Sequence, residues 1–309
     1  MTKTDVSVRE VGMRDGLQSI SFIMPTTKKH EWAVREAAAG VREIEVASFV
    51  PPKLLPQMAD GAEVVAQARK IAGLTVAALV PNLKGAERAV EAGAHKLNVV
   101  LSVSEGHNRA NVRKTVQESL AEFARIVALV RALPAERRPI VCGGLATCFG
   151  CTIEGDVPEA QVLDTVERAI ATGIDELVLA DTVGYGNPAQ VRRIFAAAQR
   201  IAGALPIAAH FHDTRGLGLA NAVAALDTGI RRLDASLGGF GGCPYAPGAS
   251  GNVDMEDLVF MLESMGMKTG VDLNRLLEVR RFIESVLPTD TFAGAVAVAG
   301  LPKNYRPAA

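Results

Sequence analysis

Short apolar stretches alternate along the chain with longer segments in which apolar residues recur at helical spacing. Eight of the short stretches are nearly continuous in Val, Ile, Leu and Ala, which is typical of parallel strands buried on both faces. We predict strands at residues 6–11, 42–48, 74–80, 96–101, 139–146, 176–180, 207–212 and 233–237.

The segments between these strands carry helix start and stop signals, such as Pro25 before one segment and Gly40 after it. A polar loop is predicted at residues 102–111, and the chain from residue 254 onward is predicted to be mostly helical. Helices are predicted at residues 26–39, 57–71, 84–92, 112–132, 160–171 and 188–202, and from the end of the seventh strand to about residue 226.

This alternation favours an α/β fold, the (β/α)8 TIM barrel of about 250 residues, with residues 254–309 as a C-terminal helical extension. An open doubly wound sheet is the competing architecture, but no Gly-x-Gly-x-x-Gly opens the first helix. Because no linker or low-complexity segment divides the chain, residues 1–309 are expected to form one catalytic domain.

Composition narrows the possible partners. The 309 residues are 49% hydrophobic and 5% aromatic, and the formal net charge is −1 with no block of like charge. A nucleic-acid surface or a polybasic membrane patch is therefore not expected, and no apolar run approaches the length of a membrane span. Four cysteines without an N-terminal apolar signal predict free thiols in a reducing cytoplasm.

Polar side chains with catalytic or ligating potential follow five of the predicted strands. Active sites of such barrels lie at the carboxyl ends of the strands, so closure of the barrel is expected to bring these side chains to one mouth. They are Arg14 and Asp15 after the first strand, Glu45 in the second, Asp181 after the sixth, His210 and His212 in the seventh, and Asn252 beyond the eighth.

The pair His210 and His212 points to a metal. Residues two apart on a strand face the same side, so both imidazoles can contact one ion. Together with Asp15 and Asn252 they offer mixed oxygen and nitrogen ligands, which suit Mg²⁺ or Mn²⁺ better than a thiolate-rich structural zinc site.

Each of these residues also has a structural interpretation. Arg14 can form a loop salt bridge with Asp15, Glu45 can pair with Arg14 or Arg42, and Asp181 can cap a helix. Their joint occurrence at strand ends nevertheless favours an active site.

The glycine-rich segment 238–252 carries one thiol, Cys243. So many glycines permit large backbone changes, and we interpret the segment as a lid with a proton-donating thiol rather than a simple turn or a phosphate cradle. Cys148 and Cys151 form a Cys-x-x-Cys, but without a second such pair neither a zinc site nor a redox couple is well supported.

Three segments together resemble the hydroxymethylglutaryl-CoA lyase family, which belongs to the metal-dependent barrel lyases and synthases related to isopropylmalate synthase. The resemblance covers nearly the whole chain, and its Cys-Pro-Tyr-Ala motif is specific to the lyase branch. The segments are Val11-Gly-Met-Arg-Asp-Gly-Leu-Gln18, His210-Phe-His-Asp-Thr214 and the glycine-rich run from residue 241 to Asn252.

The resemblance implies roles for individual residues. Asp15, His210, His212 and Asn252 match the metal ligands, Arg14 matches the residue that steadies the thioester enolate, and Cys243 matches the lid thiol. Glu45 and Asp181 match acidic residues of the active site, and substrate contacts are expected from Gln18, Ser48, His107 and Asn108.

The implied reaction is cleavage of a 3-hydroxyacyl-CoA, with 3-hydroxy-3-methylglutaryl-CoA giving acetyl-CoA and acetoacetate, as in leucine degradation. Asp181 and His210 both remain candidates for the base. Met13 replaces the usual Pro, Val178 replaces the usual Ser, and the segment 102–111 is unusual, which puts the acyl group in doubt.

Three alternatives therefore stay open. A citramalyl-CoA lyase would give acetyl-CoA and pyruvate with the same machinery, a condensing acyl-CoA synthase would run the bond formation forward, and a catalytically silent barrel would serve as a binding protein. A homodimer or higher homo-oligomer is expected by analogy with other barrels of this kind.

Overall fold

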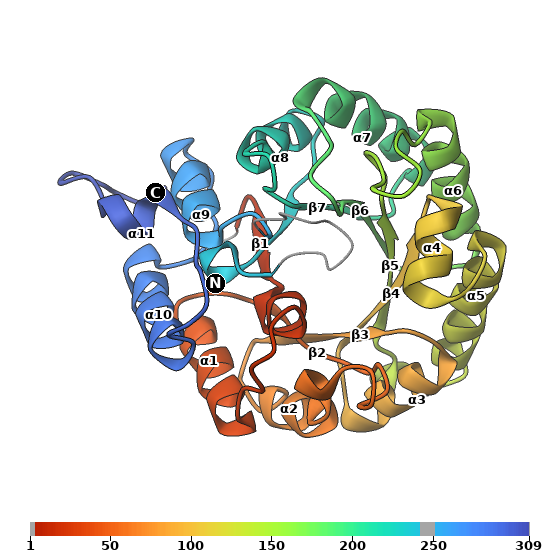
Figure 1. The fold of residues 1–309 in the computed structure, drawn as a ribbon, viewed down its shortest axis with the longest axis horizontal. Helices are drawn as coiled ribbons and strands as arrows, with labels where there is room; N and C mark the ends of the chain where they lie inside the picture. The colour runs from red at the N-terminus through yellow and green to blue at the C-terminus, as the bar shows by residue number, and fades with distance from the viewer. Residues whose placement is uncertain (1–3, 242–250, 309) are drawn as a thin grey trace.

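In the computed structural model, which describes residues 4–241 and 251–308, eight parallel strands close into a barrel in chain order (Figure 1). The predicted TIM barrel is confirmed, and each predicted strand lies within two residues of the observed one. The strands are β1 (Ser7–Glu10), β2 (Glu43–Ser48), β3 (Thr75–Val80), β4 (Lys96–Ser102), β5 (Ile140–Ala146), β6 (Glu176–Asp181), β7 (Ile207–Phe211) and β8 (Arg232–Ala235).

Helices form a ring around these strands, and the last three lie beside β1 and the first helix (Figure 1). None of the described helices is both long and apolar enough to cross a membrane. The helices are α1 (Thr26–Ala38), α2 (Gly61–Ala68), α3 (Leu83–Ala92), α4 (Glu105–Val112), α5 (Val116–Arg131), α6 (Glu159–Ala171), α7 (Pro188–Ala202), α8 (Gly218–Asp227), α9 (Met255–Ser264), α10 (Leu273–Val286) and α11 (Ala295–Ala299).

The segment predicted as a polar loop at residues 102–111 is instead largely the helix α4, so that prediction was wrong. Ser104 caps α4 by accepting a hydrogen bond from the backbone N–H of His107. The helix ends at Arg113, which takes a left-handed conformation with φ 58°. Polar residues dominate α4, so apolar periodicity could not reveal it.

The long helix predicted from residue 112 begins later, at Val116 of α5. Thr115 and Glu118 form a capping box, in which each side chain accepts a hydrogen bond from the other residue's backbone N–H. The predicted helix at residues 57–71 is also shorter, because a 3₁₀ turn at Pro56–Met58 precedes α2.

Candidate active site

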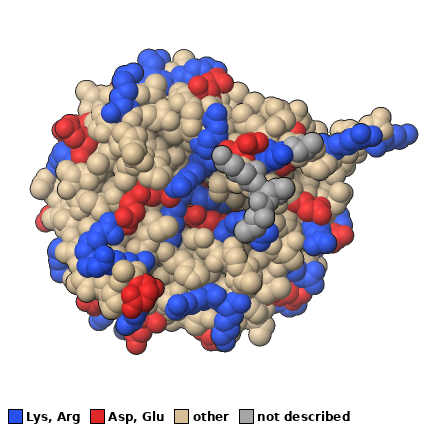
Figure 2. All heavy atoms as spheres, turned by 180° about the vertical axis from the view of Figure 1, so that it is seen from behind, with Lys and Arg blue, Asp and Glu red and all other residues tan. Residues whose placement is uncertain are grey.

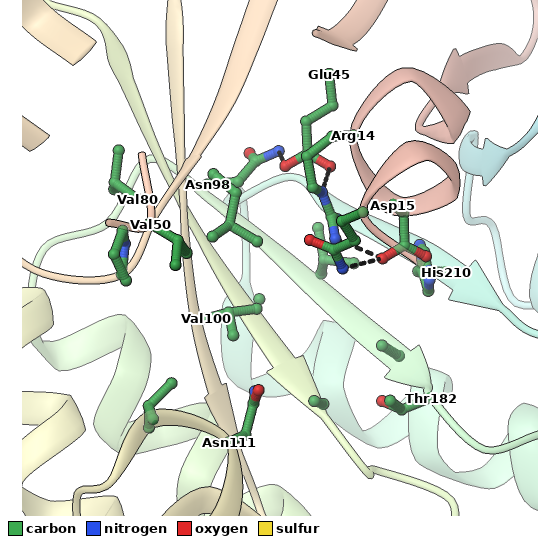
Figure 3. A pocket seen from close by; sticks show the side chains of 18 of the residues that line it. Arg14, Asp15, Glu45, Val50, Val80, Asn98, Val100, Asn111, Thr182 and His210 are labelled. Atoms are coloured by element: carbon green, nitrogen blue, oxygen red, sulfur yellow. Dashed lines mark hydrogen bonds and ion pairs between the residues drawn. The ribbon is translucent and has the colours of Figure 1, made fainter. Parts of the chain in front are cut away.

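A cavity of about 420 Å³ opens at the carboxyl ends of the strands. Its polar side and its apolar side face each other, with Arg14, Asp15 and His210 opposite Val50 and Val80 (Figure 3). The other polar lining residues include Gln18, Glu45, Asn82, Asn98, His107, Asn111, Arg113, Lys114, Thr182, His212 and Asp234.

Arg14 and Asp15 are held at the cavity by a short π-helical turn, Gly12–Gly16, which follows β1. Arg14 Nε donates to Glu45 Oε2 at 2.5 Å and Arg14 Nη1 to Asp15 Oδ1 at 2.5 Å. Asn98 Nδ2 donates to the other Glu45 oxygen at 2.8 Å, so the four side chains form one connected row (Figure 3). The pairing of Arg14 with both carboxylates fixes the direction of its guanidinium.

Three side chains meet in a geometry that suits one metal ion. One ligand atom each from Asp15, His210 and His212 lies within 4.8 Å of the others. The two imidazole Nε2 atoms are 3.1 Å apart, and His212 Nε2 is 3.7 Å from Asp15 Oδ2. Two nitrogens bound at a right angle to one ion, each at about 2.1 Å, are separated by about 3 Å. The histidine pair therefore fits a shared divalent ion.

Asn252 supplies a fourth candidate ligand. Its Nδ2 donates to Asp15 Oδ2 at 2.9 Å and to the carbonyl oxygens of Phe240 and Gly241 at 3.2 Å. Its Oδ1 is buried and finds no hydrogen-bond partner in the described part of the chain. A buried amide oxygen without a partner is costly, and a divalent cation would satisfy it.

The electrostatic environment favours the ligating forms of Asp15 and His212, and it favours the protonated form of His210. Burial opposes charge on Asp15, but Arg14 and the two histidines lower the pKa of its carboxyl below the usual value. Burial and the neighbouring His210 lower the pKa of His212 to about 4, so this imidazole is neutral at neutral pH. Despite burial, the carboxylates of Asp234 and Asp15 raise the pKa of His210.

Other residues implicated by the sequence divide into two groups. Gln18 and His107 line the cavity, and Gln18 Nε2 donates to Asp15 Oδ1 at 3.1 Å. Ser48 and Asn108 are buried outside its lining. Asn108 accepts from the Ser102 N–H and donates to the Lys114 carbonyl oxygen, so it organises α4 and its C-terminal turn.

Asp181 also lies outside the cavity lining. Its two carboxylate oxygens accept hydrogen bonds from the backbone N–H groups of Tyr185 and Gly186, each at 2.9 Å. Burial raises the pKa of this carboxyl. Asp181 therefore organises the turn between β6 and α7. Cys243, the thiol of the glycine-rich segment, lies outside the described residues.

The Cys-x-x-Cys carries ordinary buried thiols. Cys148 Sγ donates to the Leu145 carbonyl oxygen at 3.1 Å, and Cys151 Sγ accepts from Ser104 Oγ at 3.1 Å. Burial raises the pKa of Cys148 to about 12, which keeps that thiol protonated. Both cysteines are free.

Among the cavity residues that the sequence did not point to are two polar residues within strands. Asn98 contacts Glu45, and Asp234 contacts His210 at 3.2 Å. Each has apolar neighbours on both sides within its strand, Leu97 and Val99 in β4 and Leu233 and Ala235 in β8. That break in the apolar pattern was the available signal.

The HMGL-like family model matches residues 5–283. This chain belongs to that family. It is 44% identical over 279 residues to hydroxymethylglutaryl-CoA lyase YngG of Bacillus subtilis. The aligned residues cover 90% of this chain and 92% of that relative. It is 39% identical to the mitochondrial hydroxymethylglutaryl-CoA lyase of Gallus gallus, covering 91% and 93% of the two chains.

Solved structures agree with this placement. An HMG-CoA lyase from Acenitobacter baumannii, in complex with coenzyme A and 3-methylmalate, superposes with a TM-score of 0.91 at 42% identity and covers 99% of both chains. The carboxyl transferase domain of Rhizobium etli pyruvate carboxylase has a TM-score of 0.72 at 17% identity, covering 97% of this chain and 51% of that chain, and shares the fold alone.

Proposed function

We propose that this member of the HMGL-like family is a divalent-metal-dependent carbon–carbon lyase that cleaves 3-hydroxy-3-methylglutaryl-CoA into acetyl-CoA and acetoacetate. The observation that carries this proposal is the meeting of Asp15, His210 and His212 beside Arg14 in one cavity. Relatives that are 44% and 39% identical to this chain are named hydroxymethylglutaryl-CoA lyases.

Asp15, His210, His212 and the orphaned Asn252 oxygen are the residues that would hold the ion. Oxygen and neutral imidazole ligands suit Mg²⁺ or Mn²⁺. Such an ion supplies Lewis acidity, which lowers the pKa of a bound substrate hydroxyl and neutralises a substrate carboxylate.

Arg14 has the position and charge to stabilise the enolate of acetyl-CoA that forms when the C2–C3 bond breaks. Its guanidinium is fixed by Glu45 and Asp15 before substrate arrives, so little reorganisation is needed as the oxygen gains charge. Cys243 is proposed to protonate the enolate carbon, a role that rests on the family resemblance.

Of the two candidate bases, only His210 lies in the cavity, and its ring can accept a proton only while Nε2 is not bound to the ion. His210 lines the cavity, whereas both oxygens of Asp181 accept backbone hydrogen bonds outside its lining. A general base must lie within hydrogen-bond reach of the proton that it removes.

An anionic acyl-CoA suits the charges around the cavity. Lys and Arg side chains lie among Asp and Glu side chains around the central hollow of the face turned away in Figure 1 (Figure 2), and Arg113 and Lys114 belong to the cavity lining. Positive charge beside a cleft attracts phosphate-bearing ligands and raises their local concentration. We also propose a reducing cytoplasm as the location, since the described cysteines are free thiols.

The experiment that tests this proposal compares two thioesters. The Mg²⁺-loaded protein is incubated with 3-hydroxy-3-methylglutaryl-CoA and with citramalyl-CoA, and acetyl-CoA is measured together with acetoacetate or pyruvate. Acetoacetate from the first substrate at the higher kcat/KM supports the proposal. Pyruvate from the second at the higher kcat/KM would overturn the substrate assignment. No acetyl-CoA from either thioester would overturn the proposed lyase activity.

A further inference from the structure

Three charged or polar side chains lie at one level of three neighbouring strands, and one of them is the metal-ligand candidate His210. Asp234 on β8 is paired in register with His210 on β7 and with Arg9 on β1. Paired residues of parallel strands project from the same face of a sheet, so all three side chains share the barrel interior.

The contacts within this row are specific. Asp234 Oδ2 lies 3.2 Å from His210 Nδ1, and Arg9 contacts Asp234 Oδ1 through Nε at 2.6 Å and Nη2 at 2.5 Å. Arg9 is 4% exposed, so these contacts are shielded from solvent. One carboxylate therefore connects a buried guanidinium to the ring of His210.

The contacts of Asp234 determine which nitrogen of His210 carries the proton. Oδ1 of Asp234 faces the Arg9 guanidinium and Oδ2 faces the ring of His210, and an ionised carboxylate is the form that fits a group with only donors. An ionised carboxylate only accepts hydrogen bonds, so His210 Nδ1 must carry a hydrogen and donate it. In the neutral ring, Nε2 then keeps a free lone pair, and it is Nε2 that faces His212 at 3.1 Å.

We propose that Asp234, held by Arg9, is a positioning residue that fixes the ring orientation and tautomer of His210 for metal binding. This inference deepens the proposed function and rests on its metal site. Carboxylates that accept the second N–H of a ligating histidine commonly raise metal affinity in this way, and losing them typically costs 10- to 100-fold. Asp234 approaches the ring from the Nδ1 side, so it supports the ligand without joining the ligand cluster.

Arg9 is itself prevented from turning away. Its guanidinium also contacts Glu176, which Lys96 approaches to 2.7 Å and Arg232 to 2.5 Å. His212 has no comparable support, since its Nδ1 is buried without a hydrogen-bond partner among the described residues. The two histidines are therefore positioned differently, and His210 is the one anchored to the barrel interior.

The substitution Asp234→Asn has a defined consequence. Arg9 has only donors, so the amide oxygen of the variant would face Arg9 and its NH2 group would face His210 Nδ1. His210 would then have to accept at Nδ1 and carry its proton on Nε2. In that tautomer Nε2, the nitrogen that faces His212, has no lone pair for the ion. Because the change is nearly isosteric, it alters the position of the proton on the His210 ring and leaves the packing nearly unchanged.

Mn²⁺ binding is the primary measurement, by isothermal titration calorimetry on the full-length wild type and two variants. Asp234→Asn is expected to weaken Mn²⁺ binding about 10- to 100-fold. Asp60→Asn is the matched control, because it alters a partly buried ion pair, with Lys29 at 2.6 Å, away from the ligand cluster, and it is expected to bind as the wild type does. Equal affinity in wild type and Asp234→Asn, or an equal loss in both variants, would overturn the inference.

Nitrogen NMR of the imidazole rings gives a readout that does not depend on metal or activity. In metal-free protein at alkaline pH, His210 is expected to show an unprotonated Nε2 in the wild type and an unprotonated Nδ1 in Asp234→Asn. The same tautomer in both would overturn the inference and leave the proposed lyase standing. A wild type that binds no Mn²⁺ would instead overturn the metal site of the proposed function.

Where Asp234→Asn fails to fold, Arg9→Lys provides the second test. It keeps the charge but removes one of the two contacts that orient Asp234. An affinity loss of about threefold or more is expected from this weaker perturbation. An unchanged Mn²⁺ affinity in folded Arg9→Lys would contradict the proposal that Arg9 and Asp234 position His210.

Discussion

The substitution Glu45→Gln tests whether a prepositioned Arg14 drives the cleavage step. Glu45 is 3% exposed and accepts from Arg14 Nε at 2.5 Å and from Asn98 Nδ2 at 2.8 Å. A glutamine offers one acceptor oxygen where the carboxylate offers two. The variant therefore keeps the shape of the site but loses one of these hydrogen bonds and the charge that aligns the guanidinium.

The expected magnitude follows from these contacts. A hydrogen bond to a charged group contributes about 1.5–3 kcal/mol, and each 1.36 kcal/mol of transition-state stabilisation corresponds to about tenfold in rate. Asp15 still contacts Arg14 at 2.5 Å, so the guanidinium is misaligned rather than lost. We expect kcat for 3-hydroxy-3-methylglutaryl-CoA to fall by about 10- to 150-fold, with KM changed by less than about threefold.

The assay is the initial rate of acetyl-CoA release at saturating Mg²⁺, measured as kcat and KM for the wild type and two variants. Glu263→Gln is the matched control, because Glu263 is equally buried and accepts several hydrogen bonds but does not line the cavity. It is expected to lower stability without changing kcat. A wild-type kcat in Glu45→Gln, or a loss confined to KM, would show that a prepositioned Arg14 does not drive the cleavage step.

The remaining predictions concern substrate charge, pH and metal. Arg113→Ala, at a cavity-lining cation, is expected to raise KM for the acyl-CoA about 3- to 10-fold, whereas the exposed Arg109→Ala leaves it unchanged; equal KM values would contradict this. Burial raises the pKa of Glu36 and raises that of Glu10 to about 7. The folded state therefore holds protons that the unfolded chain releases, and stability falls as pH rises from about 5 to 7. The free energy of unfolding, measured with urea at several pH values, should fall less steeply in Glu36→Gln than in the wild type, by about 1.4 kcal/mol per pH unit. Equal slopes in the two proteins would contradict this prediction. Mn²⁺ at 100 times Kd should stabilise the wild type by about 2.7 kcal/mol and His212→Ala much less; equal stabilisation of both would argue against the site.

The barrel could be predicted because its strands are buried on both faces and give short, nearly continuous apolar runs. The helix α4 could not, because its residues are mostly polar and its start depends on the cap at Ser104. The start of α5 was missed for a related reason: the capping box at Thr115 overrides the apolar residue Val112, which ends α4 instead.

Part of the candidate site was also accessible from the sequence. The position of a residue at a strand end was enough to bring Arg14, Asp15 and His210 to one cavity. Position alone could not show that both carboxylate oxygens of Asp181 accept hydrogen bonds from the following turn. These local hydrogen bonds determine where the carboxylate points.

Asp234 shows the other limit. Its relation to His210 and Arg9 depends on the register of three strands that lie far apart in the chain. No local pattern encodes that register, which follows only when the barrel closes. Residues that support ligands from the interior are therefore harder to predict than the ligands themselves.

The central claim is that this cavity cleaves 3-hydroxy-3-methylglutaryl-CoA by metal-dependent chemistry. Its most direct measurement is the yield of acetoacetate and acetyl-CoA from that thioester, with protein stripped by EDTA and with the same protein reloaded with Mg²⁺. Both products are expected in equal amounts from the reloaded protein, and almost none from the stripped protein. Equal cleavage with and without metal, or no cleavage after reloading, would contradict it.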